Sequence, residues 1–132
     1  MTRTLILRLL LLSAAALAFN GTAMGHHSYA ATYDLDKKVE VKGELVVFMY
    51  RNPHSILQIM APGADGKIVR WACEWAGTRS LGLEGINNAT LKPGDKLVIT
   101  GIAGRSSEVP RLLVMSVQRP ADGWKWSGDS TK

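Results

Sequence analysis

Cysteine is almost absent from this chain, which has a single one, Cys73, among 132 residues. One cysteine excludes an intramolecular disulfide, a c-type haem attachment motif and a zinc site built on cysteine pairs. The stability of the folded protein must therefore come from packing, even in an oxidising compartment.

Catalytic motifs and clusters of one charge are also missing. We find no nucleophile motif, no partner that would let a carboxylate act in acid–base catalysis, and no glycine-rich phosphate loop. The 16 Lys and Arg residues outnumber the 11 Asp and Glu residues, but they are scattered along the chain. This distribution gives no nucleic-acid footprint, and the sequence as a whole favours a binding protein over an enzyme.

The apolar segment at residues 9–19 is well short of the roughly 20 residues that span a bilayer. It follows two arginines and precedes a small, polar stretch at 20–25, which is the order of a cleavable export signal. We expect residues 1–25 to be removed after Gly25, although small residues upstream offer alternative cleavage sites. The mature protein would begin at His26 and reside in the periplasm or outside the cell, with no stable membrane insertion.

The mature chain would keep 107 residues, with 14 basic against 11 acidic side chains and a net charge of +3. This length is enough for one domain with a modest core and too short for two. Its termini differ from the rest: residues 26–38 show no period and are expected to form an extended arm, and residues 120–132 a tail that contains Trp124 and Trp126.

Between these ends, five segments have the alternation or the bounded apolar runs of β-strands. They are separated by turn residues, and Gly43 offers a place where the long first strand can bend or bulge. A short helix is expected at 78–86, between the third and fourth strands. The expected strands cover residues 39–50, 54–61, 67–76, 96–103 and 111–119.

This order of elements predicts an all-β fold, a small five-stranded OB-like Greek-key barrel over residues 39–119 with one short helix between strands three and four. A sandwich of strands alone is the alternative, but seven or more strands do not fit into the mature chain. The alternation predicts a set of aliphatic side chains inside the barrel: Val39, Val41, Leu45, Val47, Ile56, Ile99 and Val114.

The chain has three histidines, His26, His27 and His54. A free N-terminal His26 offers an α-amine and an imidazole, which are both available as neutral donors near neutral pH. Nitrogen donors favour copper over the other divalent first-row metals, with zinc as the competitor. We therefore predict a copper site at His26 and His27, which His54 joins if the arm runs back along the first strand. The alternative is a solvated N-terminal pair and a structural His54.

Aromatic residues suggest a second kind of site. Trp71, Cys73 and Trp75 share one face of the third strand, which belongs to the core if it points inward. If it points outward, Trp71 and Trp75 form a stacking platform for a ligand, with Glu74 between them in sequence. The alternative function is therefore a metal-free module that binds carbohydrate or a protein partner, and a small metalloenzyme is a third. Buried Cys73 and the strand methionines are expected to pack rather than to bind Cu(I).

Several strings of the sequence resemble one known family. They are His26 to Asp34, the Asn52-Pro53-His54 turn, the strand from Trp71 to Trp75, and Leu91 to Asp95. Together they resemble the bacterial exported family catalogued as domain of unknown function 6152, over essentially the whole mature chain. The resemblance implies a small secreted or periplasmic β-barrel domain, and it implies no particular activity.

Overall fold

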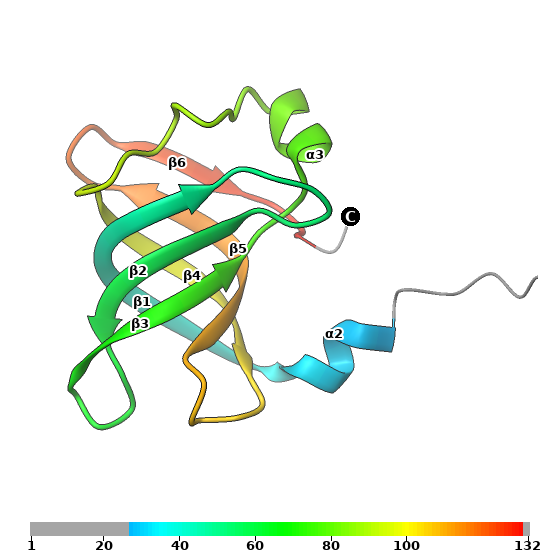
Figure 1. Ribbon diagram of the computed structural model, residues 1–132, viewed down its shortest axis with the longest axis vertical. Helices are drawn as coiled ribbons and strands as arrows, with labels where there is room; N and C mark the ends of the chain where they lie inside the picture. The colour runs from blue at the N-terminus through cyan, green and yellow to red at the C-terminus, as the bar shows by residue number, and fades with distance from the viewer. Residues whose placement is uncertain (1–26, 131–132) are drawn as a thin grey trace, which may run out of the picture.

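The computed structural model describes residues 27–130, so the expected export signal and His26 lie outside the described residues (Figure 1). None of the helices in this range is long and apolar enough to cross a membrane. The elements follow in chain order: α2 His27–Thr32, β1 Tyr33–Met49, β2 Ile56–Pro62, β3 Ile68–Glu74, α3 Thr78–Leu83, β4 Lys96–Gly104, β5 Arg111–Arg119 and β6 Trp124–Ser127.

The six strands form one sheet in the order β3-β2-β1-β4-β5-β6, and neighbours in this order are antiparallel. In addition, β3 pairs in parallel with the first half of β5, from Ala72 opposite Arg111 to Glu74 opposite Leu113. The pairings of β1 to β5 therefore form a closed circuit (Figure 1). The predicted all-β class is confirmed, and so is the helix between the third and fourth strands.

β1 pairs with β4 from Tyr33 to Glu44 and with β2 from Glu44 to Met49, and it passes close to the β2 backbone at Gly43. A Cβ atom at this position would lie 2.3 Å from the carbonyl oxygen of Met60, so only glycine allows this approach. The register of β1 against β2 shifts between Leu45 and Val47, which marks a bulge. Because a bulge inserts one residue, the side chains beyond it change face.

The bulge explains why part of the expected core is wrong. Val41, Leu45, Ile99 and Val114 are buried as predicted, and Val39 packs against the core while half-buried. Val47 is only half-buried, because after the bulge Phe48 faces the core opposite the buried Leu57. Ile56 is also half-buried, for a different reason: it precedes the buried Leu57 on β2 and so belongs to the outward row. The inward residues of β2 are Leu57, Ile59 and Ala61.

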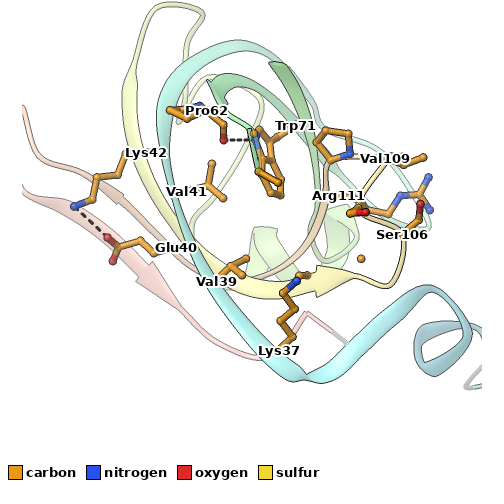
Figure 2. Close-up of a pocket in the computed structure, with 16 residues that line it drawn as sticks. Lys37, Val39, Glu40, Val41, Lys42, Pro62, Trp71, Ser106, Val109 and Arg111 are labelled. Atoms are coloured by element: carbon orange, nitrogen blue, oxygen red, sulfur yellow. Dashed lines mark hydrogen bonds and ion pairs between the residues drawn. The ribbon is translucent and has the colours of Figure 1, made fainter. Parts of the chain in front are cut away.

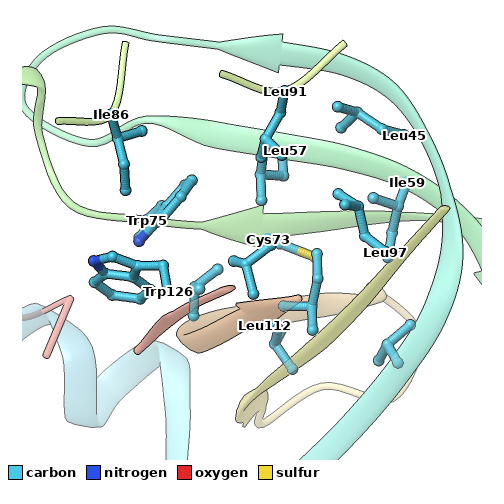
Figure 3. Close-up of a cluster of buried hydrophobic side chains, with 14 of the residues drawn as sticks. Leu45, Leu57, Ile59, Cys73, Trp75, Ile86, Leu91, Leu97, Leu112 and Trp126 are labelled. Atoms are coloured by element: carbon cyan, nitrogen blue, oxygen red, sulfur yellow. The ribbon is translucent and has the colours of Figure 1, made fainter. Parts of the chain in front are cut away.

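Trp75 lies at the centre of the core and is fully buried (Figure 3). Its ring centroid lies 5.8 Å from that of Phe48 and 5.0 Å from that of Trp126. The indole N–H of Trp75 has no hydrogen-bond partner among the described residues and points toward the Trp126 ring. Cys73 is also fully buried, as expected for a packing role.

Both terminal segments are more regular than the sequence indicates. The described part of the expected arm is not irregular, because residues 27–32 form α2 and β1 begins at Tyr33. In the expected tail, β6 pairs with the second half of β5 and brings Trp126 into the core. The Trp126 indole N–H donates to Glu84 Oε2 at 2.5 Å, which ties β6 to the end of α3.

Candidate functional site

Four polar side chains from four segments meet where α2 approaches the sheet. We call Tyr29, Tyr33, His54 and Glu74 the His54–Glu74 cluster. Tyr29 lies on α2, Tyr33 is the first residue of β1, His54 lies in the connection between β1 and β2, and Glu74 is the last residue of β3. A cavity of about 250 Å³ adjoins the cluster, and the exposed Arg51 and Arg111 contribute to its lining.

Backbone hydrogen bonds hold His54 beside Glu74. The amide of Ser55 donates to the Ala76 carbonyl at 3.2 Å, and the amide of Trp75 donates to the Ser55 carbonyl at 2.8 Å. These bonds continue the β2–β3 ladder beyond the first residue of β2 and the last residue of β3. The turn before His54 is anchored as well, because Asn52 Oδ1 accepts hydrogen bonds from the amide and the hydroxyl of Thr78.

The four side chains of the cluster form a chain of contacts. The Tyr33 hydroxyl donates to Glu74 Oε2 at 2.5 Å, and Glu74 Oε1 lies 3.6 Å from His54 Nδ1. The Tyr29 hydroxyl lies 3.1 Å from Nδ1 and 3.3 Å from Nε2 of His54, so it faces the ring edge between the two nitrogens. The Tyr29 and His54 rings meet edge to face, with centroids 5.7 Å apart. Through Tyr29, α2 is docked directly on His54.

The two phenols of the cluster are neutral hydrogen-bond donors at neutral pH. Burial raises the pKa of Tyr33, and its hydrogen bond to the Glu74 carboxylate raises that pKa further, against the opposing charge of Arg111. Burial also raises the pKa of Tyr29, with smaller contributions from the charges of Glu74 and Asp129. The carboxylate of Glu74 is therefore placed between a phenol that donates to it and an imidazole that it can orient.

A carboxylate beside one ring nitrogen is the arrangement that orients histidines in metal sites. The His54 side chain is 36% exposed, so its ring is open to a ligand as well as oriented. Within residues 27–130, no three His, Cys, Asp or Glu side chains gather where they could hold a metal ion. His54 and Glu74 alone therefore do not make a metal site within residues 27–130.

The structure separates the residues that the sequence analysis singled out into two groups. Glu74 lies with His54, and α2, which begins at His27, docks its Tyr29 on the same histidine. Trp75 belongs to the core and has no exposed surface on which a sugar could stack. Trp71, in the middle of β3, is half-buried and lies away from the His54–Glu74 cluster.

The sequence analysis missed the two tyrosines of the cluster. Tyr29 and Tyr33 are four residues apart, the spacing that places side chains on one face of a helix, and their ring centroids lie 6.2 Å apart. The four-residue spacing could have indicated that the two tyrosines lie close together. Their partners could not be read from the sequence, because Tyr33 and Glu74 are 41 residues apart.

Comparison with known families gives one match, to the model of a family of unknown function, DUF6152, over residues 13–112. Comparisons with curated proteins and with solved structures give no match. The matched range contains the whole His54–Glu74 cluster together with His26 and His27, and it ends inside β5. The match covers most of the chain, and the chain therefore belongs to the family of unknown function DUF6152.

Proposed function

We propose that this chain is an exported protein that binds a divalent metal ion, copper in preference to zinc, through His26, His27 and His54. The observation that carries the proposal is the docking of α2 on His54 through the Tyr29 hydroxyl, at 3.1 Å from Nδ1. The N-terminal segment and the β1–β2 connection, which are far apart in sequence, meet at this histidine.

The N-terminal histidines need to span only a short distance to share a metal ion with His54. α2 begins at His27, only two residues before Tyr29. A helix rises about 1.5 Å per residue, so the backbone at His27 lies within one helical turn of the residue that contacts His54. This proximity supports a site shared by the N-terminal histidines and His54, without any need for an arm to run the length of β1.

The donor set that these residues supply is rich in nitrogen. An α-amine and an imidazole have reference pKa values of about 7.7–8.0 and 6.5, so both lose their protons readily to a metal near neutral pH. Such a set favours Cu(II) over Zn(II). Glu74 would orient His54 rather than complete the site, while the fully buried Cys73 is too far inside the core to take part.

The fold and the compartment belong to the same proposal. The circuit β1-β2-β3-β5-β4-β1, with a helix between β3 and β4, supports an OB-like barrel of five strands. The N-terminal sequence supports export into the periplasm or the medium by a cleavable signal. Cleavage after Gly25 would also create the α-amine at His26 that the proposed site uses.

The test is calorimetric titration of Cu(II) and Zn(II) into tag-free protein that begins at His26. We expect one tight copper site and weaker zinc binding. His26→Ala/His27→Ala should weaken copper binding by at least about tenfold, and His54→Ala should also weaken it. Asp65→Asn is the matched control, because Asp65 is an exposed side chain in the β2–β3 loop whose partner is Lys67. Unchanged copper affinity in the double histidine variant would overturn the proposal.

A further inference from the structure

A second cavity, of about 460 Å³, opens between the β2–β3 and β4–β5 loops (Figure 2). We call it the Trp71 pocket. Its apolar wall comes from Trp71 on β3, Val39 and Val41 on β1, and Val109 in the β4–β5 loop. The volume falls within the roughly 300–1,000 Å³ of small-molecule sites.

Trp71 presents an aromatic surface in this pocket. Its indole N–H donates to the Pro62 carbonyl at 3.1 Å, so the polar atom of the side chain is satisfied within the protein. Trp71 is half-buried, in contrast to the fully buried Trp75, which follows β3 directly. A ring held in this way and left partly open can pack against a flat ligand.

The charged side chains of β1 that line the pocket lie on both faces of the strand, because side chains alternate along it. Lys37, Val39 and Val41 form one row of side chains, which runs from an exposed ammonium group to the buried core. Glu40 and Lys42 belong to the other row, pair with each other at 3.1 Å and point away from Trp71 (Figure 2). The only carboxylate among the lining residues is thus already neutralised by a lysine.

Lys37 and Arg111 are the other two cations that line the pocket. Among residues 27–130, neither Lys37 nor Arg111 forms an ion pair. Both are exposed lining residues; in Figure 2, Lys37 lies below Trp71, and the Arg111 side chain lies opposite the Glu40–Lys42 pair with its guanidinium directed away from the Trp71 ring. The pocket therefore combines an apolar, aromatic wall with positive charge at its mouth.

We propose that the Trp71 pocket binds a small organic anion that has a flat apolar body and one carboxylate. The body packs against Trp71 and the β1 valines, and the carboxylate pairs with Lys37, while Arg111 adds positive charge to the rim of the pocket. This site is distinct from the cavity beside the His54–Glu74 cluster: among the described residues the two share only Arg111, and His54 does not line the Trp71 pocket.

The experiment uses two probes of the same shape, 2-naphthoate and the neutral 2-naphthamide. Each is titrated into metal-free, ¹⁵N-labelled protein while the indole N–H signals are followed by NMR, with the Trp71 signal assigned from Trp71→Phe. We expect a saturable shift of the Trp71 signal, larger than the shifts of the other indoles. Because the carboxylate pairs with exposed cations, naphthoate should bind about two- to fivefold more tightly than naphthamide.

Two lysines on the same strand provide the matched variants. Lys37→Gln should remove most of the preference for naphthoate, whereas Lys42→Gln should leave it intact because Lys42 is paired with Glu40. Equal affinity for both probes in the parent protein would overturn the proposal, as would equal effects of the two lysine variants or uniform small shifts of all indoles. The same titration of His26→Ala/His27→Ala should be unchanged, which separates this proposal from the metal site.

Discussion

The hydrogen bond between Tyr33 and Glu74 can be tested by Tyr33→Phe, which removes one hydroxyl and keeps the buried ring. The hydroxyl donates to Glu74 Oε2 at 2.5 Å, and Tyr33 is 1% exposed. A hydrogen bond to a charged group contributes about 1.5–3 kcal/mol. Since the Glu74 side chain is 21% exposed, water can partly replace the lost donor. We therefore expect the free energy of unfolding at pH 7 to fall by about 1.5–2 kcal/mol.

The dependence of this loss on pH gives a sharper signature. Burial, followed by the Glu74 hydrogen bond, raises the pKa of Tyr33 above its unfolded value. The stabilisation is thus fully present below about pH 10, where an unfolded tyrosine starts to ionise. Above that pH the unfolded state releases a proton that the folded state keeps, so the parent loses about 1.4 kcal/mol per pH unit from this residue. The difference between parent and variant should shrink from pH 10 upward.

Urea unfolding monitored by tryptophan fluorescence, at pH values from 7 to 10.5, measures both effects. Tyr50→Phe is the matched control, because the Tyr50 hydroxyl donates to a neutral acceptor, the Thr78 carbonyl, at 2.9 Å. Its expected cost is smaller, about 0.5–1.5 kcal/mol. The reasoning is refuted if Tyr33→Phe is as stable as the parent at pH 7, or if the difference between them is constant up to pH 10.5.

Three further predictions concern the fold. Gly43→Ala should destabilise the protein by about 1–3 kcal/mol in urea unfolding, since its Cβ would collide with the β2 backbone. Gly82→Ala in α3 is the control and should be neutral or slightly stabilising. Equal effects of the two substitutions would contradict the close approach of β1 to β2 at Gly43. Leu45→Ala should cost about 2–5 kcal/mol and Val47→Ala clearly less, because the bulge turns Val47 away from the core, and the reverse order would place the bulge elsewhere. Burial raises the pKa of the Cys73 thiol to about 12, so a thiol reagent should label it only at the rate of unfolding, and rapid labelling of native protein at pH 8 would show an open core.

The strand pattern was readable from the sequence because alternation depends on local burial. The five expected strands correspond to β1 to β5, and the expected helix overlaps α3. The pattern failed after Leu45, since a bulge changes which side chains face inward and leaves no fixed mark in the sequence. Gly43 indicated a bend, but the register shift itself lies past it, between Leu45 and Val47.

The two short elements at the ends could not be predicted, because tertiary contacts stabilise them. α2 has six residues, too few to be stable alone, and it is fixed by the contacts of Tyr29 with His54 and Tyr33. β6 has four residues and depends on pairing with β5 and on the burial of Trp126. Such elements exist only once their partners are in place.

The candidate site was predictable by residue type but not by geometry. His54 and Glu74 were both singled out, for different reasons, and their proximity follows from the continuation of the β2–β3 ladder through Ser55. Trp75 was assigned an outward alternative that its burial excludes. The inward face of β3 became clear only from the pairing of β3 with both β2 and β5.

The most direct test of the central proposal is electron paramagnetic resonance of the tag-free protein loaded with one equivalent of Cu(II). If the N-terminal histidines and His54 share one ion, pulsed spectra should show imidazole nitrogens from more than one residue, and His54→Ala should lose one imidazole while Asp65→Asn changes nothing. Spectra that are identical for the parent, His54→Ala and His26→Ala/His27→Ala would contradict the proposal.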